Sequence, residues 1–247
     1  MEVSQMAQYQ DVFRRYEKKY MLSEQQHKAL MQNLDTYMTK DSYGFHTICN
    51  VYFDTASYEL IRTSIEKPVY KEKLRLRSYG IPKPGDNVFV EIKKKFDGIV
   101  YKRRVQLSLD EALSFLTLSK QTTASSQILG EIDWFMKRYM PVPKVFIAYD
   151  RLALFGNEDA NLRITFDQNI RFRECLLDPS KGSWGNHLLE PGKILMEIKI
   201  PGTMPIWLSQ ILAGLNIFPT SFSKYGNCYK QHLIYNTYQK GGINHAG

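Results

Sequence analysis

Charged side chains recur at every second position in two stretches, Lys73-Leu74-Arg75-Leu76-Arg77 and Phe89-Val90-Glu91-Ile92-Lys93. A period of two sends successive side chains of a β-strand to opposite faces, so the charged residues of each stretch share one face. Arginine binds phosphate oxygens through a planar fork of N–H donors, and lysine acts as a mobile point charge. The pattern therefore indicates a basic sheet face that suits a phosphate-rich anion.

The same alternation extends this basic face over further predicted strands. By parity, its cations are Arg15, Lys19, Lys73, Arg75, Arg77, Lys93, Lys102, Arg104, Arg163 and Lys199. Only three carboxylates share the face, those of Glu17, Glu91 and Glu197. Parity leaves open whether the face is an ordinary charged exterior. Because like charges on neighbouring strands destabilise a sheet, however, the crowding of one sign favours a bound polyanion.

The three glutamates suit a hard divalent cation that shares its coordination with substrate phosphates. Phosphoryl transfer needs little beyond such positioning and charge stabilisation. The sequence has no Gly-x-x-x-x-Gly-Lys-Ser/Thr loop, no Gly-x-Gly-x-x-Gly turn and no histidine pair at zinc-ligand spacing. These absences disfavour a P-loop site, a dinucleotide-binding fold and a zinc centre.

Basic and aromatic residues also interleave, in Arg14-Arg15-Tyr16 and in Tyr101-Lys102-Arg103-Arg104. Such interleaving occurs in proteins that bind single-stranded nucleic acid, whose bases stack on aromatic rings. The aromatic residues are not concentrated on the predicted basic face. Nucleic-acid binding is therefore the weaker alternative, and no specific nucleic acid is expected as a partner.

The composition is that of a globular, basic protein. Of 247 residues, 43% are hydrophobic, and 33 Lys and Arg against 25 Asp and Glu give a net charge of +8, which favours anionic partners. Three scattered cysteines indicate a reducing compartment, and no apolar run approaches the roughly 20 residues of a membrane span. We therefore expect a cytoplasmic protein without a membrane span, of unspecified oligomeric state.

Predicted strands and helices alternate in groups along the chain. Besides the charged meander between residues 69 and 107, strands are predicted over residues 12–21, 45–53, 145–155, 162–166 and 194–200. Helices are predicted over residues 58–64, 108–116, 128–139, 205–215 and 227–238, with another begun by a capping box at Ser23 and Gln26. This pattern predicts one α+β domain over residues 1–247, its sheet possibly closed into a barrel, with roughly the first ten and last eight residues peripheral.

Several stretches together resemble one family in their order and spacing. They are Glu17-Lys-Lys19-Tyr20, Tyr52-Phe-Asp54-Thr, Leu74-Arg75-Leu-Arg77-Ser-Tyr-Gly80, Phe89-Val-Glu91-Ile-Lys93, Lys102-Arg-Arg104, Leu162-Arg163-Ile-Thr-Phe-Asp167, Met196-Glu197-Ile-Lys199 and Ser221-Phe-Ser-Lys224-Tyr225. The chain resembles the polyphosphate polymerase domain of the vacuolar transporter chaperone (VTC) complex, in the superfamily of triphosphate tunnel metalloenzymes. The resemblance implies an antiparallel β-barrel with flanking helices, whose basic tunnel holds a nucleoside triphosphate or a polyphosphate chain.

The resemblance also implies residue roles. The implied phosphate ligands are Lys19, Arg75, Arg77, Lys93, Lys102 and Arg163, to which the shared face adds Arg104 and Lys199. Glu197 is implied to hold Mn²⁺ or Mg²⁺, and Glu17 and Glu91 are further candidate metal ligands. Lys224 is implied at the reacting phosphate, together with Arg75 and Arg77; its place rests on the resemblance alone.

The first strand departs from a related pattern. Tunnel hydrolases of the CYTH branch begin with Glu-x-Glu-x-Lys, whereas this chain has Arg15-x-Glu17-x-Lys19, which argues against a two-metal hydrolase. We expect an enzyme that transfers the γ-phosphoryl group of ATP to a polyphosphate chain, with pyrophosphate or orthophosphate as further ligands. A metal-dependent inorganic triphosphatase and a non-catalytic polyphosphate-binding module are the alternatives.

Overall fold

The computed structural model describes residues 16–97, 99–118 and 126–234. Its strands are β1 Tyr16–Leu22, β2 Met38–Lys40, β3 His46–Asp54, β4 Tyr70–Tyr79, β5 Asn87–Phe96, β6 Ile99–Ser108, β7 Val142–Gly156, β8 Arg163–Arg173, β9 Asn186–His187, β10 Ile194–Ile200 and β11 Pro219–Thr220. Its α-helices are α1 Glu24–Leu34, α2 Glu59–Ile65, α3 Leu109–Leu118, α4 Gln127–Tyr139, α5 Ile206–Gly214 and α6 Lys224–Cys228, and a π-helical turn, Tyr229–Leu233, follows α6.

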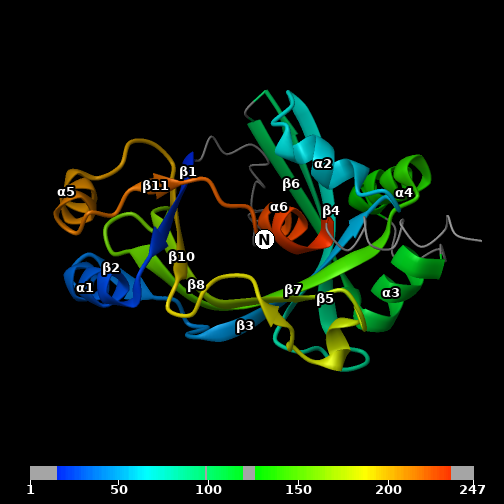
Figure 1. Ribbon diagram of the computed structural model, residues 1–247, viewed down its shortest axis with the longest axis horizontal. Coiled ribbons are helices and arrows are strands. Elements are labelled where there is room, and N and C mark those ends of the chain that lie inside the picture. The colour runs from blue at the N-terminus through cyan, green and yellow to red at the C-terminus, as the bar shows by residue number, and fades with distance from the viewer. Residues whose placement is uncertain (1–15, 98, 119–125, 235–247) are drawn as a thin grey trace, which may run out of the picture.

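The strands form one antiparallel sheet in the order β11-β1-β10-β8-β7-β3-β4-β5-β6, with β2 paired to β7 and β9 to β8. The 15-residue strand β7 pairs with β3 on one edge and with β8 on the other, so it belongs to both halves of the sheet. Its register against β8 shifts between Ala148 and Asp150, an irregularity that bends a strand. The sheet curls around α6 as a tunnel-like barrel (Figure 1), although no hydrogen-bonded ladder joins β6 to β11 within the described chain.

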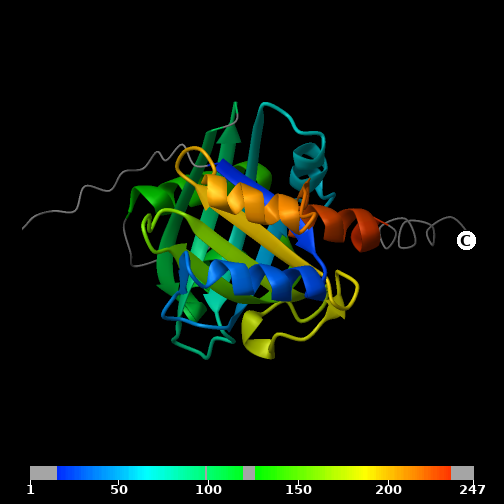
Figure 2. The ribbon, with the colours of Figure 1, turned by 90° about the vertical axis from the view of Figure 1, so that its left-hand side faces the viewer.

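Two hydrophobic cores back the outer face of the sheet. Val51, Leu76 and Val90 pack with Phe135 of α4 and Ala112 of α3, on the outside of β3, β4 and β5. A second set packs α1 and α5 against β1, β8 and β10, and both helices run across this face in Figure 2. Its members include Leu22, Leu30, Phe166, Ile198 and Leu208. The apolar residues of the alternating pattern thus face outward to helices, which leaves the charged residues on the inner face of the curl.

A third core lies on the inner side of β3 and β7. Tyr52 and Ile147 pack there with Ile61 of α2 and with Tyr225 of α6. This packing places the short helix α6 between the two halves of the sheet, as Figure 1 shows. The strand β4 with its neighbours β3, β5 and β6 is called the β4 wall below, and β8, β10 and β1 are called the β10 wall.

The α+β class and the antiparallel barrel-like sheet were predicted correctly. The prediction for residues 162–166 was too short, because β8 runs on to Arg173, and the last helix begins at Lys224 rather than at residue 227. The predictions for residues 12–15, including Arg15, and for the chain after residue 234 lie outside the described residues. Within the described chain, none of the helices has the length and apolar character to cross a bilayer.

Candidate phosphate-binding site

Glu91 gathers three of the predicted cations on the β4 wall. Its Oε2 accepts from Nε of Arg75 at 2.8 Å and lies 2.6 Å from Nη2 of the same guanidinium. Nη1 of Arg77 is 3.8 Å from Oε2, and Nζ of Lys102 is 3.1 Å from Oε1. Burial alone would raise the pKa of Glu91, whose side chain is only 2% exposed, but these three cations lower it to about 2. The carboxylate is therefore ionised at neutral pH, and it holds both arginines in place.

Side chains of β3 and β7 orient the same arginines. Asn50 accepts from Nε of Arg77 at 3.0 Å, and the Tyr149 hydroxyl accepts from Nη2 of that guanidinium at 3.3 Å. The Tyr52 hydroxyl accepts from Nη1 of Arg75 at 3.3 Å. Because planar guanidinium forks bind phosphate with fixed geometry, arginines held from several sides are prepared to receive phosphate oxygens without reorganising.

A second charged cluster lies on the β10 wall and is completed by α6. Nζ of Lys224 is 2.5 Å from Oδ2 of Asp167 and 3.6 Å from Oε1 of Glu197. Arg151 binds Asp167 with both arms of its guanidinium, at 2.6 Å and 2.8 Å. Nζ of Lys19 lies 3.6 Å from Oε1 of Glu197. Five charged groups from β1, β7, β8, β10 and α6 thus converge at one point.

The pKa directions follow from this convergence. Burial would lower the pKa of Lys224, but the carboxylates of Asp167 and Glu197 raise it above its ordinary value. Burial would likewise raise the pKa of both carboxyl groups, but the neighbouring cations, Lys224 foremost, lower it. All three groups are therefore charged at neutral pH, and the two carboxylates are weak bases.

Helix α6 places Lys224 beside Asp167 and Glu197, because the Ser223 cap and the contacts of Tyr225 hold the first turn of the helix. Ser223 caps the helix, its Oγ accepting from the Gly226 amide at 3.2 Å. The Tyr225 hydroxyl donates to Oδ2 of Asp54 at 2.9 Å, and the Tyr225 ring stacks on Tyr52 with centroids 4.9 Å apart. Asp54 also accepts from amides in the first turn of α2, so α2 and α6 are anchored to the end of β3 at one carboxylate.

The two walls face each other closely enough to interact electrostatically. The pKa of Lys73 is lowered to about 7, first by burial and then by Lys71, Lys93 and Lys19. Burial also lowers the pKa of Lys93, with contributions from Lys19 and Arg75. Lys19 stands on the β10 wall, and no strand of that wall pairs with β4 or β5. Cations on distant strands are therefore forced together by the curl of the sheet.

The remaining predicted residues lie on the same inner face. Lys199 is 3.8 Å from Oε2 of Glu197, and Arg163 is its partner in the register of β10 and β8. Arg104 lies opposite Glu91 in register, with its guanidinium carbon 4.7 Å from the centre of the Phe89 ring. The structure thus brings to one face those predicted cations that lie within the described residues; their roles as phosphate ligands stay predictions.

Sequence reasoning missed Arg151 and Asp167 as site residues. Asp167 shares the parity of Arg163 and Thr165 on β8, so the alternation itself carried the signal, but the predicted strand ended too early. Arg151 is a charged residue in a long strand rich in apolar residues, and its partner Asp167 is revealed only by the pairing of β7 with β8. The pairing of β7 with β8 could not be predicted from the sequence.

The carboxylates fit a metal ion only in combination with substrate. No group of three or more His, Cys, Asp or Glu side chains is placed to hold a metal among the described residues. Oε1 of Glu17 and Oε1 of Glu197 both lie near Nζ of Lys19, at 3.5 Å and 3.6 Å. Mg²⁺ is commonly bound by one or two carboxylates with substrate phosphates and water. Glu197 with Glu17 matches that donor set, although lysines pair with both carboxylates as the arginines and Lys102 pair with Glu91; the metal roles stay predictions.

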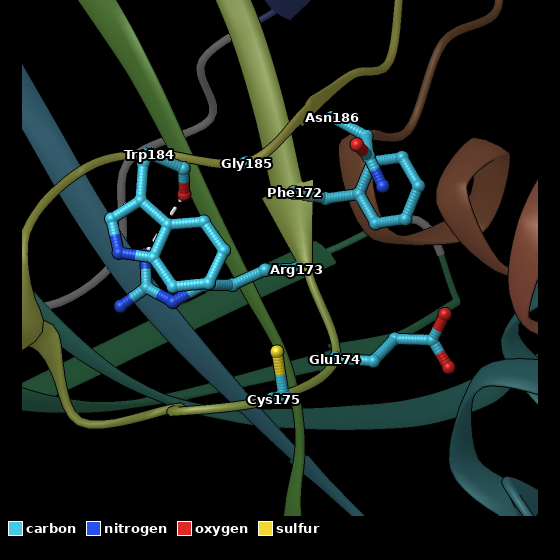
Figure 3. A pocket seen from close by; sticks show the side chains of 7 residues that line it. All are labelled: Phe172, Arg173, Glu174, Cys175, Trp184, Gly185 and Asn186. Carbon is cyan, nitrogen blue, oxygen red and sulfur yellow. Dashed lines mark hydrogen bonds between the residues drawn. The ribbon is translucent and has the colours of Figure 1, made fainter.

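A separate cavity of about 350 Å³ lies beside the end of β8 (Figure 3). Arg173 in its lining is buried and donates to the backbone carbonyls of Leu176, Asp178, Gly182 and Trp184. Its guanidinium also lies over the rings of Phe146 and Trp184, at 3.5 Å and 4.7 Å from their centres. The guanidinium of Arg173 thus holds the loop after β8, and this cavity is not part of the basic inner face.

Comparison with known proteins agrees with the fold. A putative adenylate cyclase from Bacillus halodurans superimposes with a TM-score of 0.53 at 15% identity, over 84% of this chain and 92% of that one. A putative adenylyl cyclase from Hippeastrum, described as having a dominant triphosphatase activity, gives 0.49 at 15% identity, over 87% and 94%. The first likeness confirms the tunnel-type fold. No curated protein matches the sequence. The model of the VTC domain matches residues 14–233, nearly the whole chain, and the protein therefore belongs to the VTC domain family.

Proposed function

We propose that this protein transfers the γ-phosphoryl group of a nucleoside triphosphate, ATP in the first instance, to the end of a polyphosphate chain. The observation that carries the proposal is the convergence of cations from both walls on one inner face, with Lys224 delivered to its centre. Such a face neutralises a chain of phosphates, and phosphoryl transfer is catalysed mainly by positioning and charge stabilisation.

In the proposed reaction the bond between the γ-phosphorus and its bridging oxygen breaks, and the nucleoside diphosphate leaves with that oxygen. A terminal oxygen of polyphosphate forms the new bond to phosphorus. Lys224, Arg75 and Arg77 would bind the oxygens on which charge accumulates. A divalent ion on Glu197 and Glu17 would add charge neutralisation between the phosphates when it is bound.

The acidic groups favour transfer over hydrolysis. Attack by water is assisted by a base that removes its proton, and the efficiency of such a base rises with its pKa. Asp167 and Glu197 have lowered pKa values because cations surround them, so they would be poor bases. A polyphosphate oxygen is already anionic and needs no such help. This argument favours the polymerase over the inorganic triphosphatase.

The test is incubation of the pure protein with ATP and Mn²⁺ or Mg²⁺, followed by separate measurement of ADP, polyphosphate and orthophosphate. Polyphosphate formed together with ADP supports the proposal. Orthophosphate and ADP formed without polyphosphate would identify a triphosphatase, and tight tripolyphosphate binding without turnover in either metal would identify a binding module.

Two variants test whether the activity depends on Lys224. Lys224→Met removes the ammonium group and should lower turnover by roughly 10²–10³-fold, the usual effect of losing a donor to developing charge. Lys137→Met is the matched control, since Lys137 lies on the outside of the molecule with its side chain 76% exposed. Near-normal turnover in Lys224→Met, with an unchanged melting temperature, would refute the role of Lys224.

A further inference from the structure

Four rings form a continuous row at one end of the inner face. The ring centroids of Tyr43 and His46 are 6.1 Å apart, those of His46 and Tyr79 are 6.1 Å apart, and those of Tyr79 and Phe89 are 5.7 Å apart. These spacings are typical of interacting aromatic side chains. The guanidinium of Arg104 lies over the Phe89 ring at the end of the row. We call Tyr43, His46, Tyr79 and Phe89 the aromatic row.

The register places the aromatic row directly beside the phosphate-binding arginines. Phe89 is the cross-strand partner of Arg77, and Tyr79 follows Arg77 by two residues on the same face of β4. Two residues of strand span about 6.6 Å, so Tyr79 and Arg77 are neighbours along this face of β4. Aromatic residues are not concentrated on the basic face as a whole, but Tyr79 and Phe89 lie on it at this end.

The opposite end of the same face has a different character. Lys73 precedes Tyr79 by six residues on β4, a distance of about 20 Å along a strand. Lys73 pairs with Lys93, and Lys93 pairs with Lys102. The inner face thus runs from a row of rings to a group of lysines, with Arg75, Arg77 and Glu91 between them.

The aromatic row is not an ordinary piece of core. Tyr43 is 78% exposed and Tyr79 is 51% exposed, and both lie outside the three buried clusters. Rings that interact with one another while presenting their surface to water are suited to stacking on a flat ligand. A ligand that joins such a flat group to several phosphates would match the rings and the arginines at once.

We propose that the aromatic row binds the base of the nucleoside triphosphate, while its phosphates extend past Arg77 toward Lys224. The inference rests on the proposed function, because it takes the triphosphate to lie among the cations. Arg104, over Phe89 and opposite Glu91 in register, lies where the row meets the cations and would contact the sugar or the first phosphate. Stacking tolerates any base, so ATP and GTP should bind with similar affinity.

The test compares the binding of ATP with that of inorganic tripolyphosphate, which has the phosphates but no base. Isothermal titration calorimetry on the full chain should give a lower Kd for ATP than for inorganic tripolyphosphate. Tyr79→Ala should raise the Kd for ATP by about tenfold, the scale of losing one base–aromatic stack, and leave the Kd for tripolyphosphate unchanged. Tyr79→Phe keeps the ring and should retain the affinity for ATP.

Tyr16→Ala is the matched control, because Tyr16 is 62% exposed and by parity lies on the face of β1 opposite to Lys19. The inference would be overturned if Tyr79→Ala raised the Kd for ATP and the Kd for tripolyphosphate equally, or if it raised neither. Failure of the proposed function has a different signature. If ATP loses affinity selectively in Tyr79→Ala but no polyphosphate forms, the base site stands and the polymerase proposal falls.

Discussion

Binding of a polyanion should cause lysine side chains on the inner face to take up protons, most of them at Lys73. Its pKa is lowered to about 7 by burial and by the cations around it. Burial, with Arg75 and Arg77, lowers the pKa of Lys102 to about 8 against the opposing effect of Glu91. Bound phosphates supply negative charge beside both amines, which favours their charged forms and raises both pKa values.

The size of the effect follows from these values. At pH 8 Lys73 is about one-tenth protonated in the free protein and Lys102 about half, so saturation with phosphate should draw in about 1.4 protons. At pH 6 both amines are already protonated, and the uptake should vanish. Because the pKa values are higher in the complex than in the free protein, affinity is greatest below pH 7 and falls as pH rises through 7 and 8.

Calorimetric titration with tripolyphosphate at pH 8, in two buffers of different ionisation enthalpy, measures the protons exchanged. The phosphate ligand releases or binds its own protons equally with every variant, so the informative quantity is the difference between variants. Lys73→Met should take up about 0.9 proton fewer than the wild type. Lys137→Met should match the wild type. The same uptake in Lys73→Met and wild type would show that Lys73 is already charged in the free protein, and the reasoning would fail.

Three further predictions concern groups that support the site. Glu91 has a pKa of about 2, lower than in the unfolded chain, so its stabilisation should be present above pH ~4.5 and lost toward pH 2. The melting temperature of Glu91→Gln should therefore fall less toward low pH than that of the wild type. An equal fall in both proteins would contradict the stabilising role of the Glu91 carboxylate. Tyr225→Phe removes the hydrogen bond to Asp54 and should lower the free energy of unfolding by about 1–2 kcal/mol. Its kcat should fall while its tripolyphosphate Kd holds, and a changed Kd with normal kcat would argue against positioning. Arg173→Leu should expose the loop after β8 to proteolysis without altering phosphate affinity, since its donors all face that loop.

The strands of the β4 wall could be predicted from the sequence because the sheet has one apolar and one charged face. Leu74 and Leu76 alternate with Arg75 and Arg77, and the structure buries the leucines against helices. Alternation fixes which side chains share a face, so a basic face could be inferred without knowing the order of the strands. The capping box at Ser23 is equally local, and it forms as predicted.

Contacts between distant strands could not be predicted in this way. The ion pair of Arg151 with Asp167 depends on the pairing of β7 with β8, and the approach of Lys19 to Lys73 depends on the curl of the whole sheet. The last helix began earlier than its sequence pattern indicated, because Ser223 is a capping residue whose partner amide is only three residues away. That displacement matters, since it puts Lys224 in the first helical turn.

Among the described strands no ladder joins β6 to β11, so backbone hydrogen bonds do not close the curled sheet between these two strands. β11 is two residues long and pairs with β1 only at Lys19 and Tyr20, so the margin of the roll has few hydrogen bonds to lose. The spacing of the two margins depends on side chains and not on a fixed repeat of backbone bonds. The distance between the two margins can therefore change without breaking a backbone ladder, and amide protons along the margins should exchange with solvent before those of β7.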